Sequence, residues 1–269
     1  MKFFSITLAA LLSALAATAQ TTDRAFSVRD VDFGLKGGGT FTSGFTNVPS
    51  FPVGNTGVSI PELNNKGNGI GVGYSGGLWA RKNFRSFFVQ VEATYNRFVL
   101  KQKTDFVIDV NANPALVAAI PFSVQNGLLN ANIAAETESV LESVNVPVLF
   151  GKRFVGGRLR AYLGPNFIFV NKAELKRTTS GRINASAAGF PETPIPTNTA
   201  TTNLLNRYEA QNLEVKDFTY AVELGVGFSP VRFLDVDVRY AVPVGGVYRD
   251  SNITGFLGIT TVSLGLKVL

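Results

Sequence analysis

The stretch FTYAVELGVGFSPVRFLDVDVRYAV, residues 218–242, gives the clearest indication of the fold. From Phe218 to Phe228 every even position is bulky and apolar, whereas the odd positions are small or polar. Residues 234–242 alternate in the same way after a short Ser-Pro turn. A period of two residues predicts β-strands, and two such runs around a short turn predict a β-hairpin.

The two faces of this hairpin differ in chemistry. One face is continuously apolar and partly aromatic, whereas the other carries Glu223, Asp235, Asp237 and Arg239. In a soluble sandwich, the apolar face would be the core and the charged face would meet water. In a membrane barrel, the apolar face meets lipid and the polar face lines the interior. The rest of the sequence has to distinguish between these two architectures.

The composition favours a chain with an apolar exterior. Only 16% of the 269 residues are charged, against about 25% in typical soluble domains, while Gly (27) and Phe (22) are frequent. The formal net charge is +6. The absence of Cys excludes disulfides and thiolate metal sites, and the absence of His removes the commonest general base and metal ligand.

Residues 1–19 have the parts of a secretory signal peptide. Lys2 supplies the positive charge, residues 6–17 form the apolar core, and an Ala-Thr-Ala cleavage site follows. The apolar run is shorter than the about 18 residues that a membrane-anchoring helix needs. We therefore expect cleavage after residue 19, a short periplasmic segment over residues 20–29, and no transmembrane helix beyond it.

Alternation of the same kind recurs over residues 30–269 and predicts eight strands. They cover residues 30–43, 69–81, 87–100, 140–154, 158–175, 218–228, 234–242 and 253–269. Three long loops are expected at residues 44–68, 104–138 and 176–212. Within the second loop, residues 114–135 are rich in Ala and Leu, which fits a short helix or a flap over the barrel mouth.

The connections alternate between long and short, which is typical of an up-and-down outer-membrane barrel. The strands are long enough to cross, since about 9–11 tilted residues suffice. Closure of the sheet also removes both edges. The sequence therefore predicts an all-β fold, an eight-stranded antiparallel transmembrane barrel with long extracellular loops and with both termini in the periplasm. A periplasmic lipocalin-like barrel or sandwich is the alternative.

Several short motifs resemble the PorT-like outer-membrane β-barrel family of Bacteroidota. The motifs are VNVPVLFGKRF at residues 144–154, YLGPNF at 162–167, GVG at 225–227 and LDVDVRY at 234–240. The resemblance spans residues 30–269 and implies the fold and the outer-membrane location. The family name also carries a link to type IX secretion. The chain departs from many outer-membrane barrels by ending in Leu269 instead of Phe.

Two motifs that carry chemistry in other proteins are incomplete in this chain. Residues 71–76 match G-x-G-x-x-G, but a dinucleotide site needs a strand before the motif and a helix after it. Small residues on a strand that faces a crowded interior explain the match better. The DVNAN sequence at residues 109–113 begins like a calcium loop, yet Pro114 and Ile120 occupy the positions that require Gly and Glu.

Charged residues on the inward parity predict a structural ion network inside the barrel. Buried charges need partners, and the inward set contains four acids and four bases. The set is Lys36, Glu92, Arg160, Glu223, Asp235, Asp237, Arg239 and Lys267. Paired carboxylates could also form a glycosidase site, but the interior of an eight-stranded barrel is only wide enough for side chains. We therefore expect no catalytic, cofactor or metal site.

Aromatic residues on the outward parity are expected to contact lipid and the membrane interface. They are Phe87, Tyr95, Phe150, Phe228 and Tyr240. Trp79 has the inward parity near a short turn, and it fits either the lumen or the interface. Basic residues near the third loop are candidates for contact with lipopolysaccharide headgroups, a solvated loop being the alternative. They are Lys172, Lys176, Arg177, Arg182 and Arg207.

The expected partners are outer-membrane lipid, the barrel-assembly machinery and an unidentified protein, and nucleic acid is not expected. The sequence favours a non-enzymatic barrel with a plugged lumen and a structural, surface-interaction or assembly-partner role. The alternatives are a small transport channel and a membrane enzyme. A nucleophilic Ser or Thr would lack a His base, which argues against the enzyme.

Overall fold

A computed structural model of the chain describes residues 31–52, 59–109, 130–184, 192–210 and 213–268. The expected signal peptide, the segment 20–29 and most of the calcium-like motif lie outside these residues. Among the described residues no helix has the length and apolar character to cross a membrane, which has no bearing on crossing by strands.

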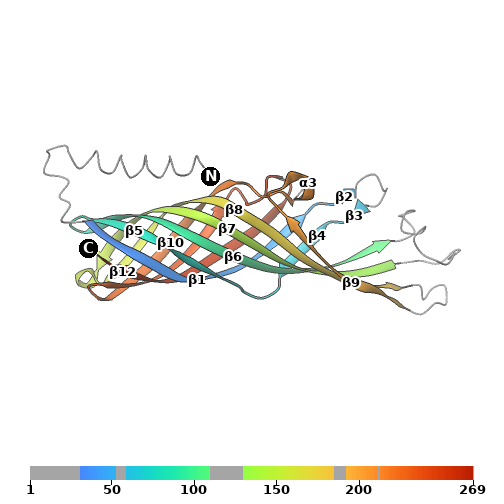
Figure 1. Cartoon of the computed structure of the whole chain (residues 1–269), viewed down its shortest axis with the longest axis horizontal. Coiled ribbons are helices and arrows are strands. Elements are labelled where there is room, and N and C mark those ends of the chain that lie inside the picture. The colour runs from blue at the N-terminus through green and yellow to red at the C-terminus, as the bar shows by residue number, and fades with distance from the viewer. Residues whose placement is uncertain (1–30, 53–58, 110–129, 185–191, 211–212, 269) are drawn as a thin grey trace.

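Eight antiparallel strands close into a barrel, as predicted (Figure 1). Each of the eight pairs with the one that follows it along the barrel, and the last pairs with the first through a ladder that runs from Gly34↔Lys267 to Asn47↔Thr254. The strands are β1 (Val31–Val48), β5 (Gly71–Asn83), β6 (Phe87–Asp109), β7 (Asn130–Phe154), β8 (Leu159–Asn184), β10 (Phe218–Val231), β11 (Leu234–Val244) and β12 (Thr254–Lys267).

The alternation in sequence becomes an alternation in burial. Along β10 exposed and buried residues follow one another without a break from Phe218 to Phe228. Leu224 is 56% exposed on the outer face, whereas Glu223 beside it is 4% exposed in the lumen. Because side chains of a strand point to opposite faces in turn, one parity covers the barrel and the other fills it.

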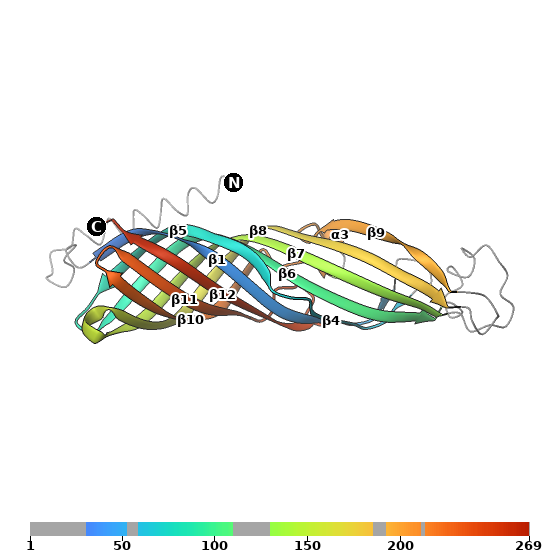
Figure 2. The ribbon, with the colours of Figure 1, turned by 90° about the horizontal axis from the view of Figure 1, so that it is seen from below.

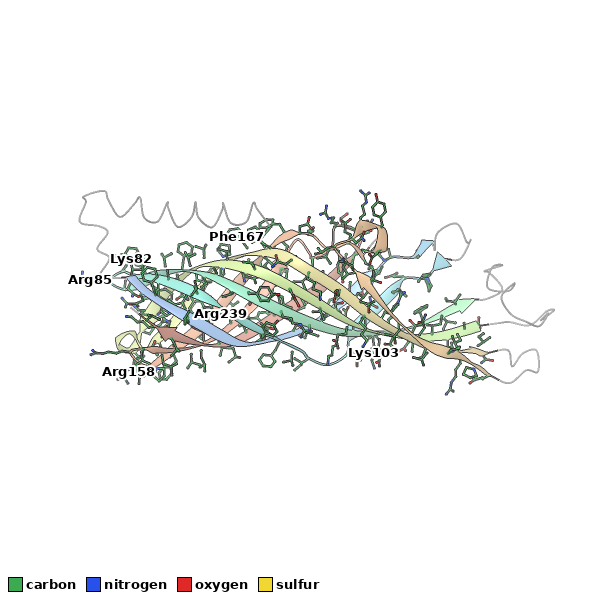
Figure 3. All side chains as sticks on the ribbon, viewed as in Figure 1. Lys82, Arg85, Lys103, Arg158, Phe167 and Arg239 are labelled. Carbon is green, nitrogen blue, oxygen red and sulfur yellow. The ribbon has the colours of Figure 1, made fainter. Side chains whose placement is uncertain are left out.

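The short connections β5–β6, β7–β8 and β10–β11 share one end of the barrel, the short-turn end, at the left of Figure 1. Figure 3 shows Lys82, Arg85 and Arg158 at this end. The β7–β8 turn is a 3-10 segment, Val155–Gly157 (η3). Its residues Gly156 and Gly157 have φ of 63° and 87°, a backbone region that Gly adopts at little cost.

Aromatic rings mark two levels on the outer surface. Phe84 and Phe87 stack near the short-turn end with ring centroids 4.4 Å apart. Farther along the barrel, Tyr74 stacks on Tyr95 at 6.5 Å, and Phe45 stacks on Phe256 at 6.4 Å. Rings of aromatic residues at two heights, with aliphatic side chains between them, are typical of an apolar transmembrane band.

The expected long loops contain more strand than the sequence suggested. The β6–β7 ladder continues to Asp109↔Asn130, so residues 104–109 and 130–138 form strand where a loop was expected. Strand β8 likewise runs to Asn184 and pairs with β9 (Thr193–Asn203), inside the expected loop 176–212. This extended sheet projects beyond the closed barrel (Figure 2), and Figure 3 places Lys103 on it.

The extension escaped prediction because its sequence lacks the regular alternation of the membrane-crossing strands. Outside the membrane neither face of a strand has to be continuously apolar, and only a small cluster forms here, in which Ile108 and Ala131 pack with neighbouring apolar side chains. The ladder is also supported by opposite charges, with Lys101 facing Glu138 and Lys103 facing Glu136. The end of the barrel that carries this sheet is called the long-loop end below.

Smaller elements complete the long-loop end. Within the expected loop 44–68, β2 (Phe51–Pro52) pairs with β3 (Ser59–Ile60), and β4 (Leu63–Gly67) bridges β1 and β6. A four-residue helix, α3 (Arg207–Ala210), follows β9. Residues 114–129 of the proposed helix or flap lie outside the described part, and residues 130–135 belong to β7.

Candidate functional site in the barrel lumen

The half of the lumen near the short-turn end is filled by an equal number of acidic and basic side chains. Each is at most 7% exposed, and together they come from β1, β5, β6, β8, β10 and β11. This set, the lumen network, consists of Lys36, Arg81, Glu92, Arg160, Glu223, Asp235, Asp237 and Arg239. Four cations and four carboxylates leave the group with no formal net charge.

Arg239 is the centre of one part of the lumen network. Its Nη1 donates to Oε2 of Glu92 at 2.8 Å and to Oε1 of Glu223 at 2.9 Å. Its Nη2 also donates to Glu92, and its Nε donates to the hydroxyl oxygen of Tyr162 at 3.1 Å. One guanidinium therefore joins carboxylates on β6 and β10 across the lumen, through charge-assisted hydrogen bonds. Figure 3 shows Arg239 within the outline of the barrel.

Asp235 is the centre of the second part. Its Oδ1 accepts from Nη1 of Arg160 and its Oδ2 from Nη2 of Arg81, both at 2.8 Å. Nη2 of Arg160 then reaches Oδ1 of Asp237 at 3.3 Å. Lys36 connects the two parts, because its Nζ lies 3.0 Å from both Glu92 Oε1 and Asp237 Oδ2. The eight side chains thus form one continuous system.

Two glycines on β10 make room for these long side chains. A Cβ at position 225 would lie 2.6 Å from the ring of Tyr162 and 3.0 Å from Cγ of Arg239. A Cβ at position 227 would lie 2.7 Å from Nη2 of Arg160 and would also meet Asp237. Gly at positions 225 and 227 therefore lets the side chains of Arg239 and Arg160 pass close to the backbone of β10.

The structure brings together seven of the eight residues predicted for the ion network. The eighth, Lys267, lies apart at the short-turn rim, where it pairs with Asp32 and its side chain is 36% exposed. Lys267 is the last residue of β12, so its side chain lies at the mouth of the barrel, where the other strands do not cover it.

Arg81 takes the place in the network that was assigned to Lys267, and sequence reasoning missed it. The available signal was parity, since Arg81 shares the inward face of β5 with Trp79. That Trp lies in the lumen at 3% exposure and donates from Nε1 to the carbonyl oxygen of Leu35 at 3.2 Å. The guanidinium of Arg81 lies over the Trp79 ring, 4.6 Å from its centroid.

The chemistry that this arrangement supports is charge pairing. Each of the four carboxylates has a cationic partner, so none stands as a free acid or base beside a substrate-sized space. The described residues contain no group of three or more Asp or Glu placed to hold a metal ion. The G-x-G-x-x-G match at residues 71–76 lies inside β5, where its backbone belongs to the sheet.

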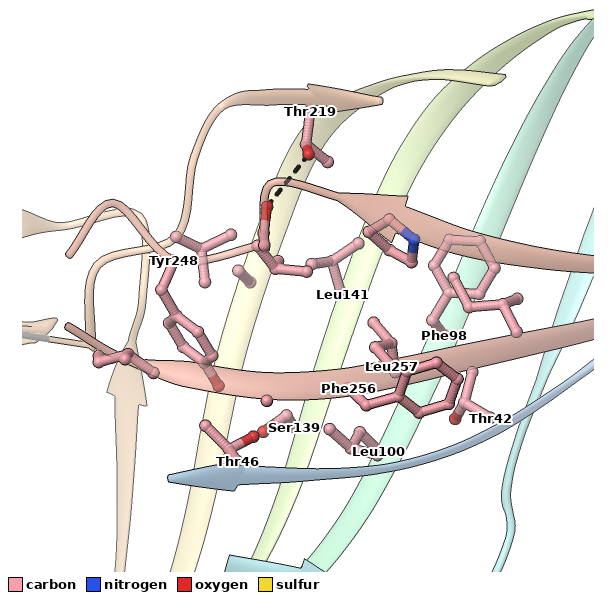
Figure 4. Close-up of a pocket in the computed structure, with 18 of the residues that line it drawn as sticks. Thr42, Thr46, Phe98, Leu100, Ser139, Leu141, Thr219, Tyr248, Phe256 and Leu257 are labelled. Carbon is pink, nitrogen blue, oxygen red and sulfur yellow. Dashed lines mark hydrogen bonds between the residues drawn. The ribbon is translucent and has the colours of Figure 1, made fainter. Parts of the chain in front are cut away.

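The other half of the lumen, near the long-loop end, is apolar. Buried side chains that include Phe98, Ile168, Val170 and Ile259 pack into one hydrophobic cluster. They surround a cavity of about 260 Å³, called the upper cavity below (Figure 4). Beside the lumen network the second cavity is far smaller, about 30 Å³.

Comparison with known proteins identifies the family. The family model described as "Outer membrane protein beta-barrel domain" matches residues 18–249. No curated protein matches the sequence.

Three solved structures are similar over most of this chain but share little of its sequence. Ail of Yersinia pestis is 10% identical, over 88% of this chain and 99% of its own, with a TM-score of 0.36. Neisserial surface protein A is 10% identical, over 87% and 96%, with a TM-score of 0.31. A mutant of the TodX monoaromatic hydrocarbon channel is 6% identical, over 87% and 90%, with a TM-score of 0.28. With most of its length matched by the family model, this chain belongs to the outer membrane protein β-barrel domain family, and its location is the outer membrane.

Proposed function

We propose that this protein is a non-enzymatic outer-membrane barrel whose lumen is plugged by its own side chains, with a structural, surface-interaction or assembly-partner role. The observation that carries the proposal is the lumen network. Side chains from six strands meet across the interior and hold one another in place through short charge-assisted contacts. An eight-stranded barrel leaves an interior that side chains can fill.

The closed interior argues against a general porin. The cavity beside the network, about 30 Å³, has room for about one or two water molecules and not for a solute. Moving an ion past the network would require breaking buried pairs such as Arg239–Glu92 and Lys36–Asp237, which is costly in a low-dielectric site. The small transport channel considered from the sequence is therefore the less favoured function.

The chemistry of the lumen also argues against an enzyme. The chain has no His or Cys, and the buried carboxylates are occupied by cations. A catalytic acid or base needs a pKa near the working pH and access to a substrate proton. The paired carboxylates of the lumen network lack that access.

The extended sheet offers the surface for a partner. Strands β6 to β9 carry charged side chains well beyond the aromatic band, including Lys101, Lys103 and Lys176. Of the basic residues considered for lipopolysaccharide contact, Lys172 lies 3.0 Å from Glu174 and Arg182 lies 3.5 Å from Glu192, so both already have acidic neighbours. A protein partner with mixed charge fits this surface as well as a lipid headgroup does.

Reconstitution in planar lipid bilayers tests the plug. The purified protein is expected to show no large, steady conductance. Arg239→Ala removes the centre of the network, and Lys267→Ala, at the rim, is the matched control. A stable, ion-selective channel in the unmutated protein would contradict the proposal and support transport instead.

Two finer proposals concern processing and kinship. We propose cleavage of residues 1–19 as a signal peptide, which mass spectrometry of the mature protein from outer-membrane fractions tests directly. We also propose that the chain is related to the PorT-like group, on the motifs at residues 144–154 and 234–240. Pull-down of the detergent-extracted protein would reveal whether a secretion component or another partner accompanies it.

A further inference from the structure

Two connections lie over the upper cavity at the long-loop end. The chain after β9 returns to the barrel, where Leu204 donates its N–H to the carbonyl of Ala173 at 2.8 Å and its side chain is buried in the hydrophobic cluster. The β11–β12 connection lies against it, since Lys216 N–H donates to the carbonyl of Val247 at 2.9 Å. Thr219 donates to the carbonyl of Gly246 at 3.2 Å (Figure 4).

The lining of the upper cavity offers hydrocarbon and few free polar groups. Aliphatic and aromatic side chains from six of the barrel strands dominate it. Three of its hydroxyl groups already have protein partners: Thr42 donates to the carbonyl of Val99, Thr219 donates to Gly246, and Thr46 accepts from Gln102 at 3.0 Å. Ser139, Tyr248 and Thr254 add further hydroxyls to a lining in which apolar side chains are far more numerous. The lining therefore suits a hydrocarbon better than a strongly polar ligand.

Beside this cavity, the neighbouring strands β11 and β12 of the barrel wall do not pair with each other. The β11–β12 ladder ends at Ala241↔Ile259. Beyond it, β11 continues to pair only with β10, up to Tyr220↔Val244, and β12 continues to pair only with β1, up to Asn47↔Thr254. Pro243, on the unpaired edge of β11, has no N–H to offer a ladder.

The unpaired stretch, called the wall gap, lies at the aromatic level and borders the cavity. Val242 and Pro243 line the cavity from one side of the gap, and residues 254–257 line it from the other. Val244 lies opposite Tyr220 in the β10–β11 ladder, and Phe256 lies opposite Phe45 in the β1–β12 ladder. The gap is therefore at the height where an outer-membrane barrel meets the lipid interface.

We propose that the upper cavity binds a hydrocarbon chain, which enters sideways from the membrane through the wall gap. Size supports the assignment, since an engineered apolar cavity of about 150 Å³ in another protein binds benzene and this one is larger, about 260 Å³. The position of the gap supports it too. The two connections lie over the cavity at the long-loop end, whereas the wall gap borders the cavity from the side. This site is separate from the lumen network, so the plug can be correct whether or not the cavity binds a ligand.

A cavity-filling variant tests binding. Ala173 lines the cavity and is 1% exposed, so Ala173→Phe places a ring in the space. Ala161→Phe is the matched control, because Ala161 lies on the outer face of the same strand. The full chain, in lipid nanodiscs, is titrated with dansyl-labelled undecanoic acid and then with unlabelled dodecanoic acid. Ala173→Phe should lower the saturable affinity at least tenfold, and Ala161→Phe should leave it unchanged. Equal binding by all three proteins, or no saturable binding to any, would overturn the proposal.

Cross-linking tests the route. The chain has no Cys, so Pro243→Cys with Leu257→Cys provides one reactive pair across the gap. Closure by a short bis-maleimide should slow probe entry at least tenfold relative to the same variant capped with N-ethylmaleimide. Unchanged entry in fully cross-linked protein would overturn the side route.

Native mass spectrometry of protein extracted from its membrane separates two sources of the chain. Retention of a phospholipid by the unmutated protein and its loss from Ala173→Phe would identify a lipid tail, and the mass of a fatty acid would identify a free ligand. Either mass supports the proposal. An occupant without a hydrocarbon chain would contradict it.

Discussion

The two halves of the lumen are built by the same strands but filled by different chemistry. Near the short-turn end, Arg239, Arg160 and Lys36 meet four carboxylates, whereas near the long-loop end Phe98 and Ile168 border an open cavity. On β11 the change occurs within two residues, from buried Arg239 to buried Ala241. Long side chains with paired charges fill the space between strands, while short apolar ones leave part of it empty. Closure of the barrel therefore does not by itself determine how full the barrel is.

The largest effect is expected from breaking the lumen network at its centre. Arg239→Ala should lower the free energy of unfolding by about 3–5 kcal/mol, because it leaves Glu92 and Glu223 buried without this partner. Urea unfolding in lipid vesicles, followed by the fluorescence of Trp79, the only Trp of the chain, measures the change. Arg239→Lys should recover part of the loss. A cost below about 1 kcal/mol would mean that the network is not a buried unit.

A charge placed on the outer face should destabilise the protein because this face contacts lipid, whatever fills the lumen beneath it. Val238 is 44% exposed on the outside, so Val238→Arg is expected to cost about 2–4 kcal/mol near the middle of the band. Ser263→Ala is the inward control. Its hydroxyl has no hydrogen-bond partner among the described residues, so its removal should cost far less. Equal unfolding free energies for the two variants would mean that the faces are assigned the wrong way round.

An added methyl group should be tolerated less well beside the buried arginines than at an open position on another strand. Gly227→Ala forces a methyl group against Arg160 and should destabilise the protein by about 1–3 kcal/mol. Gly37→Ala is the control, because the nearest atom to its new Cβ would be a carbonyl oxygen at 3.9 Å. Denaturant midpoints for both variants test the difference. If Gly37→Ala proved as harmful as Gly227→Ala, strand flexibility and not crowding would explain the loss.

The smallest effect is expected at the rim. Lys267 pairs with Asp32 where water reaches both side chains, so Lys267→Ala should change stability by less than about 1 kcal/mol. The effect should also decline at high salt, because exposed pairs are screened. A loss as large as that of Arg239→Ala would show that the rim pair supports the network after all.

The alternation of residues was enough to predict the barrel and its two faces. Neighbours such as Leu224 and Glu223 differ so strongly in polarity that the sequence indicates which of the two faces lipid and which faces the lumen. The same signal failed for residues 104–109 and 130–138, which form strand without a regular alternation of apolar and polar residues. It placed Lys267 on the inward side without revealing that this residue lies at the rim. Arg81 was not predicted for the network, although its position in the strand has the inward parity.

The fold class, the number of barrel strands and the inward or outward direction of most barrel side chains follow from the amino-acid sequence alone, because a local period of two residues specifies them. An irregularity in the β7–β8 ladder breaks this period, so that Ala173 is buried although its parity in β8 is that of exposed Ala161. Which charges meet is a property of the folded barrel. Arg81 pairs with Asp235, 154 positions away, and Arg239 with Glu92, 147 positions away. The stagger of the strands in a closed barrel sets the depth of each residue along the lumen, and no local pattern encodes it. The length of the extended sheet, the end of the β11–β12 ladder and the cavity beside it were likewise visible only in the folded structure.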